Sequence, residues 1–205
     1  IDMSRYPLPE ITNMVRGNRK IGLGVMGFAD MLYQLGIPYN SEAALLKAEE
    51  VMQFIQEASH DASLELAETR GTFENYPEST HAAAGTPYRN ATTTTIAPTG
   101  TLSIIAGCSS GIEPLFALSF VRTVLDNDKL MEVNPYFEQV AREKGFYSAE
   151  LMDTIARTGT ITHIEEIPEE VRKVFVTAHD VSPEWHIRMQ AAFQKYTDNA
   201  VSKTV

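Results

Sequence analysis

Residues 90–103 have the sequence NATTTTIAPTGTLS, which is typical of a strand followed by a turn and the start of a helix. Branching at Cβ stiffens the side chains of residues 92–96, which favours an extended backbone. Pro98 disfavours helical geometry at Ala97, so the strand is expected to end there. The sequence therefore predicts a strand over 92–96, a turn through Gly100, and a short helix over 102–106 that Gly107 ends.

The loop that follows this strand has the composition of an anion-binding site. It offers free backbone N–H groups, hydroxyl side chains and a glycine that lets a ligand approach the backbone. Phosphate is the expected ligand, because the start of a helix favours negative charge. An ordinary strand-to-helix connection with good capping residues would use the same residue types, and neither a Gly-x-Gly-x-x-Gly nor a Gly-Lys-Ser/Thr motif is present. The candidate ligand-binding residues are Thr99, Gly100, Thr101, Leu102 and Ser103.

Length and composition describe a globular chain with one sizeable core. It has 205 residues, of which 43% are hydrophobic and 21% charged. A net charge of −10 argues against a nucleic-acid or anionic-membrane surface. No apolar run has the length of a membrane span and the first residues do not resemble a signal peptide, so a cytoplasmic protein is expected. One cysteine excludes an intramolecular disulfide framework and a cysteine-rich zinc site.

Helix signals recur along the chain. The clearest helix is expected over 41–70, after the capping residue Ser41, and others start at Asn134, Ser148, Pro168 and Ser182. Strands are expected over 116–125, as a buried strand, and over 199–205. This long spacing of strands favours a parallel α/β arrangement over a hairpin sheet.

The glycine-rich segment 21–27 precedes a helical pattern. Its glycines are expected to allow close packing of a helix. A nucleotide-binding loop is the alternative, and it is disfavoured because no strand pattern precedes the segment.

Several titratable residues invite a catalytic or metal-binding interpretation. His60 and Asp61 are neighbours on the long helix, where a surface pair is the expected arrangement. His179, Asp180 and His186 are too irregularly spaced to predict a zinc or iron site.

Residues 90–114, which end in the block SSGIEP, closely resemble the substrate-phosphate region of the large (catalytic) subunit of ribonucleotide reductase. The class that depends on adenosylcobalamin (vitamin B12) is the most similar. Residues 1–7 resemble an interior segment of the same family. The resemblance implies that residues 1–205 are a fragment of one catalytic domain without an internal boundary. Its α/β fold would be part of a ten-stranded α/β barrel, helix-rich with few parallel strands.

The family reduces the ribose 2′-hydroxyl with a cysteine thiyl radical and a thiol pair. Its radical cysteine lies in an Asn-x-Cys-x-Glu pattern, which this chain does not contain, so the catalytic residues are expected elsewhere. Cys108 is accordingly interpreted as a packing residue and Glu113 as a structural carboxylate. Arg122 is expected to form a structural ion pair, with a phosphate as the alternative partner.

Carried over from the family, the substrate-phosphate contacts fall on Thr99, Gly100, Thr101, Leu102 and Ser103. The implied cofactor is adenosylcobalamin. The implied partners are a ribonucleotide, a thioredoxin-like or dithiol reductant, and dNTP or ATP effectors, and a homodimer is one open oligomeric state. The alternatives are a reductase whose partner subunit generates the radical (class I), a non-catalytic phosphate-binding module, and a helical interaction protein.

Overall fold

The computed structural model describes the backbone of residues 1–123 and 129–205. It describes the side chains of residues 1–120 and 132–205. The backbone forms two compact units, which are described separately. The first comprises Ile1–Gly24, Ala48–Ala97 and Ala192–Val201. The second comprises Val25–Lys47, Pro98–Ala191 and Ser202–Val205.

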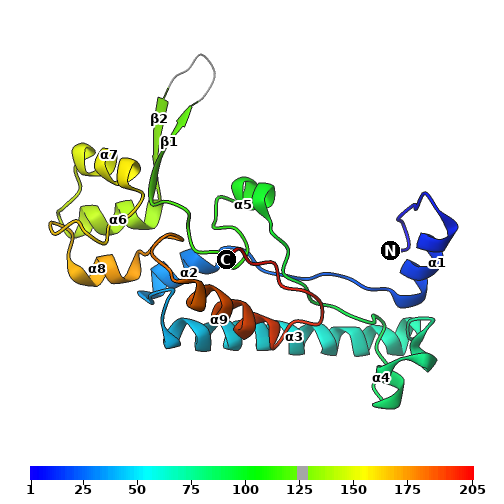
Figure 1. The fold of residues 1–205 in the computed structure, drawn as a ribbon. Helices are drawn as coiled ribbons and strands as arrows, with labels where there is room; N and C mark the ends of the chain where they lie inside the picture. Colours follow the sequence, from blue (N-terminus) through cyan, green and yellow to red (C-terminus); the bar gives the residue numbers. More distant parts are fainter. Residues whose placement is uncertain (124–128) are drawn as a thin grey trace. The chain divides into compact units, whose positions relative to one another are not determined.

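Helices dominate the described residues (Figure 1). In chain order the elements are α1 (Pro9–Asn18), α2 (Phe28–Leu35), α3 (Glu42–Arg70), η1 (Tyr76–Glu78), α4 (Thr80–Ala83), α5 (Gly100–Ala106), β1 (Ser119–Thr123), β2 (Lys129–Val133), α6 (Pro135–Glu143), α7 (Ala149–Thr158), α8 (Glu169–Val174) and α9 (Pro183–Gln194). None of these helices combines the length and the apolar character that crossing a membrane requires.

The helix starts agree with the predicted capping residues. The Ser41 Oγ accepts a hydrogen bond from Ala44 N at 3.2 Å before α3. The side chains of Asn134 and Ser148 cap α6 and α7 in the same way. Because each cap satisfies an N–H group that lacks an intrahelical partner, these short polar side chains fix where the helices begin.

Three extended segments pair in parallel in the first unit. Isolated parallel bridges join Leu23 to Thr94 and Ile96 to Val201. Segments 92–96 and 199–205, both expected to be strands, are therefore neighbours at Ile96 and Val201. The pairing consists of single bridges and ends at Val201, so neither segment forms the continuous strand that was expected.

Gly22 and Gly24 lie against an extended segment, whereas the glycines of segment 21–27 were predicted to allow close packing of a helix. A Cβ atom on Gly24 would lie 2.1 Å from the carbonyl oxygen of Thr95, and one on Gly22 would lie 2.5 Å from Thr95 Cγ2. These glycines let the segment approach the extended chain at Thr95, rather than a helix. The hydrogen bond from Thr95 N to the Leu23 carbonyl, at 2.9 Å, depends on that approach.

The second unit contains an antiparallel hairpin, which corrects the prediction for residues 116–125. Strand β1 pairs with β2 from Ser119↔Val133 to Thr123↔Lys129. Phe116, expected in a buried strand, is 74% exposed. Among the described residues this hairpin is the only multi-residue sheet, and the parallel pairing that was expected consists of the single bridges of the first unit. The pattern of β2 (KLMEV) is too short and polar to be recognised from sequence.

The apolar core of the second unit lies between the hairpin, α6, α7 and α8 (Figure 1). Leu118, Phe137, Met152, Ile155 and Phe175 are almost completely buried in it. The Tyr33 ring of α2 stacks on Phe175 with centroids 4.7 Å apart, and its hydroxyl donates to the Val176 carbonyl at 2.8 Å. This core contains Leu115 and Leu118, which precede the hairpin, and Val133 at its end.

Candidate functional site

The predicted loop is the first turn of α5. Thr99 is the N-cap residue and has a left-handed backbone, with φ of 53° and ψ of 24°. The helix begins at Gly100, two residues earlier than the sequence pattern predicts, and Gly107 ends it with a φ of 65°. The structure thus brings all five predicted residues together in one helical turn.

The turn lies at Thr99, and the prediction that it passes through Gly100 is wrong. Gly100 is helical, and a Cβ atom added to it would meet no heavy atom within 4 Å. The positive φ belongs to Thr99 instead. A β-branched residue is seldom found in this conformation, so other contacts must hold Thr99 there.

The five residues present different groups. Gly100, Thr101 and Leu102 are exposed at the start of the helix, where N–H groups have no intrahelical acceptor. Ser103 is buried, and its Oγ donates to the Gly100 carbonyl at 3.0 Å. The Thr99 Oγ1 accepts from Gly111 N at 2.8 Å. The groups open to a ligand are therefore the N–H groups of the first turn and the Thr101 hydroxyl.

Residues 109–113, from here on called the strap, pass beside this turn. Ser109 N donates to Asp30 Oδ2 at 2.6 Å, and Gly27 N donates to the Ser109 carbonyl at 2.7 Å. Ser110 Oγ donates to the Pro98 carbonyl at 2.5 Å. The strap therefore connects α2 to Pro98 and Thr99. Asp30 was missed from sequence, because nothing in a helical pattern signals a partner that lies 79 residues further along the chain.

The end of the strap meets a buried ion pair. Lys203 Nζ lies 2.5 Å from Glu113 Oε2 and 2.6 Å from His186 Nδ1, and its side chain is 0% exposed. Thr204 N donates to Glu113 Oε1 at 2.7 Å. Burial lowers the pKa of Lys203, and the neighbouring Glu113 carboxylate opposes that shift. Burial and the Lys203 charge lower the pKa of His186, which fits a neutral ring that accepts from Lys203 at Nδ1. Glu113 thus has the structural contacts expected of it.

Two further residues named from the sequence are Cys108 and Arg122. Cys108 is partly buried and lines a cavity of about 250 Å³ with Asp30 and Tyr136, and its role as a packing residue stays a prediction. The Arg122 side chain lies outside the described residues. No group of three metal-ligating side chains occurs in the part of the chain that the structure describes.

His60 pairs with Asp198 rather than with its neighbour Asp61. The His60 Nε2 lies 3.0 Å from Asp198 Oδ1, while Thr93 N and Thr94 N donate to Asp198 Oδ2 at 2.7 and 3.2 Å. Burial alone would raise the pKa of Asp198, but the hydrogen bonds from His60, Thr93 and Gln56 outweigh it and lower that pKa. This carboxylate holds the threonine-rich segment in the first unit.

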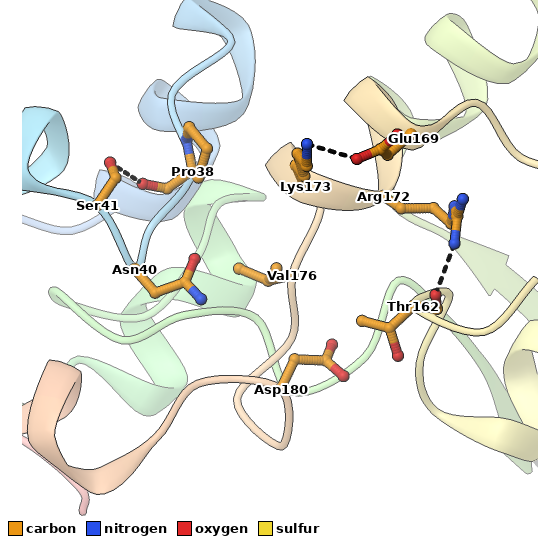
Figure 2. A pocket seen from close by; sticks show the side chains of 9 residues that line it. All are labelled: Pro38, Asn40, Ser41, Thr162, Glu169, Arg172, Lys173, Val176 and Asp180. Carbon is orange, nitrogen blue, oxygen red and sulfur yellow. Dashed lines mark hydrogen bonds and ion pairs between the residues drawn. The ribbon is translucent and has the colours of Figure 1, made fainter.

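A separate cavity of about 500 Å³ in the second unit contains none of the predicted ligand-binding residues (Figure 2). Its two cationic side chains already have partners. Lys173 pairs with Glu169 at 2.5 Å, and Arg172 Nη1 donates to the Thr162 carbonyl at 2.9 Å. The remaining lining residues are Pro38, Asn40, Ser41, Val176 and Asp180.

Known proteins similar to this chain are ribonucleotide reductases. A Vitamin B12-dependent ribonucleoside-diphosphate reductase from Thermoplasma acidophilum is 57% identical over 205 residues, which are 100% of this chain and 27% of that protein. One from Mycobacterium tuberculosis (strain CDC 1551 / Oshkosh) is 51% identical over 100% of this chain and 29% of its own length. The chain thus spans less than a third of the length of these relatives.

A solved structure and a family model agree with these relatives. The Actinobacillus ureae class Id ribonucleotide reductase alpha subunit matches with a TM-score of 0.78 and 28% identity, over 94% of this chain and 34% of that subunit. The family model described as "Ribonucleotide reductase, barrel domain" matches residues 1–88 and 83–205. The chain belongs to the ribonucleotide reductase barrel-domain family.

Proposed function

We propose that this chain is part of the catalytic subunit of an adenosylcobalamin-dependent ribonucleoside-diphosphate reductase, within a single barrel domain. The printed names of the two similar relatives support this class. The proposal includes a ribonucleotide substrate, a thioredoxin-like or other dithiol reductant, and dNTP or ATP effectors. Adenosylcobalamin would generate the thiyl radical on a cysteine expected outside this chain. No residue that lines the cavities described above is assigned to that cofactor.

The contribution proposed for this chain is to hold the substrate phosphates. The observation that carries it is the exposed first turn of α5, where the N–H groups of Gly100, Thr101 and Leu102 have no intrahelical acceptor. The Thr101 hydroxyl would add one hydrogen bond. Fixing the phosphates orients the ribose, and orientation of this kind can contribute several kcal/mol to catalysis.

The test is Gly100→Val in the full-length enzyme. Because Gly100 is helical and its Cβ position is open, the variant should fold and melt like the wild type. The valine side chain should block the anion. Charge-assisted hydrogen bonds contribute roughly 1.5–3 kcal/mol each, so losing two should raise the substrate KM by about two to four powers of ten. Thr101→Ala should have a smaller effect, since it keeps the backbone donor.

The matched control is Ala106→Val, which adds the same branched side chain to the exposed last residue of α5. It should leave the KM unchanged. Steady-state kinetics of deoxynucleotide formation and a thermal melt are measured for each variant. An unchanged KM in a folded Gly100→Val enzyme would show that the substrate phosphates do not bind at this loop.

A reductase whose partner subunit generates the radical is the second candidate, since the matched solved structure is a class Id alpha subunit. Activity of the purified full-length protein that requires adenosylcobalamin, and no second protein, would favour the first candidate. Activity that requires a partner subunit, and no cobalamin, would favour the second.

A further inference from the structure

Every residue of the strap, from Ser109 to Glu113, takes part in at least one hydrogen bond. Besides the bonds of Ser109, Ser110 and Gly111 given above, the Ile112 carbonyl accepts from the Tyr39 hydroxyl at 2.6 Å. Glu113 is held by Lys203 and by Thr204 N. Such complete bonding of an irregular segment gives it one conformation, which a loop with free groups would not have.

The bond that matters for the phosphate loop is the one from Gly111. Its N–H donates to Thr99 Oγ1 at 2.8 Å, and Thr99 is the N-cap residue with a φ of 53°. Because a β-branched residue rarely adopts this backbone, the contact with the strap holds Thr99 in place. The direction of the first-turn N–H groups therefore depends on where the strap lies.

The position of the strap depends in turn on Lys203. A fully buried ammonium group has to be paired, and all three of its donors are used, toward Glu113, His186 and the Thr204 carbonyl. The Glu113 side chain is 24% exposed, so its charge is only partly solvated without Lys203. Loss of the ammonium would leave this carboxylate free to turn toward water, and Gly111 would move with it.

We propose that Lys203 is a positioning residue for substrate phosphate: it fixes Glu113, and through the strap it fixes the Thr99 turn that presents the N–H groups. This inference rests on the proposed phosphate-binding function. It assigns a role in substrate affinity to a residue that is 90 positions from Glu113 in sequence.

The test compares Lys203→Met with Lys203→Met/Glu113→Gln in the full-length enzyme. Lys203→Met should raise the KM for the nucleotide, and the inhibition constant of inorganic pyrophosphate, by about tenfold or more, with kcat within about twofold. In the double variant the neutral amide at position 113 can still accept from Thr204 N, so both constants should recover at least part of the way. The double variant also keeps the test valid if the single variant folds poorly, since it contains no unpaired, partly buried carboxylate at position 113.

The matched control is Lys195→Met, which removes the lysine of another Lys–Glu pair, at 2.6 Å from Glu49, and should change neither constant. A loss of kcat and melting temperature with both constants unchanged would make Lys203 merely structural and overturn the inference. If Gly100→Val raises the KM and neither Lys203 variant does, the inference fails while the phosphate function stands. If Gly100→Val has no effect either, both fail.

Discussion

At the scale of single residues, Thr99 differs most from what the sequence predicts for the site. It combines a left-handed backbone with branching at Cβ, and its hydroxyl is the acceptor for Gly111 N. The sequence pattern predicts the turn at Gly100, because glycine is the usual residue with positive φ. The positive φ is instead found at Thr99, whose hydroxyl accepts a hydrogen bond from the strap.

Thr99→Val should destabilise the protein. Valine keeps the shape and the branching of threonine, and it leaves the Gly111 N–H without its acceptor, which should cost about 1–3 kcal/mol in the free energy of unfolding. Thr101→Val, the same replacement at an exposed position of the same turn, should change it by less than about 0.5 kcal/mol. Urea denaturation of the full-length protein measures both. Equal stabilities of the two variants would show that the Gly111 bond does not hold Thr99.

At the scale of elements, the glycine segment shows how a close approach between two backbones is made possible. Gly24 faces the Thr95 carbonyl, which is backbone and cannot rotate away, whereas Gly22 faces the end of the Thr95 side chain. The two glycines are two residues apart and face the same residue, so they form an internal comparison.

Gly24→Ala should therefore be more costly than Gly22→Ala. A Cβ at 2.1 Å from an oxygen forces the segments apart and breaks the pairing at Leu23 and Thr94, which we expect to cost about 1–3 kcal/mol or more. The Gly22 variant can be relieved by rotation of Thr95 and should lose less. Thermal melts of the two full-length variants provide the comparison. The reverse order of melting temperatures would contradict this packing.

Most helices were predictable from sequence, and the pairing of extended segments was only partly so. Capping side chains act within one turn, so Ser41, Asn134 and Ser148 reveal where helices start. The run at 92–96 likewise carries its own extended preference. The hairpin at β1 and β2 was missed because β2 has no strand pattern of its own and is set by its neighbour. In the candidate site, the five loop residues stay a prediction from sequence, whereas Asp30 and Lys203 were not predicted, since their partners are distant in the sequence.

At the scale of the whole molecule, acid should weaken the contacts around Asp198. The pKa of Asp198 is lowered in the folded protein, from an ordinary value of 3.8, so the folded state binds fewer protons than the unfolded state. Its stabilising contribution is then complete above the unfolded pKa and is lost as the pH falls below about 4 toward the lower folded pKa. The pKa of Asp2 is lowered to about 2 by Arg19, so the stabilising contribution of Asp2 is also lost as the pH falls.

The measurement is hydrogen exchange at the Thr93 and Thr94 amides of the full-length protein between about pH 6 and about pH 3, corrected for intrinsic exchange rates. Protection of both amides should fall at the acidic end, because they donate to Asp198 Oδ2. In Asp198→Asn, protection should be lower at the upper end of this range and nearly independent of pH. A wild-type protein that keeps full protection at the acidic end would contradict the assignment.

The parallel bridges of the first unit also have a consequence for synthesis on the ribosome. Asn90 Nδ2 bonds to the Arg19 carbonyl, 71 residues earlier, whereas Thr95 Oγ1 bonds to the Ala200 carbonyl, 105 residues later. At about 5–20 residues per second, translation needs roughly 5–20 s to reach Ala200 after Thr95 has been made. During that time the nascent chain exposes one edge of an uncharged, β-prone threonine run, which is the kind of segment that aggregates. Slower translation should therefore increase the demand for chaperones that shield residues 92–96.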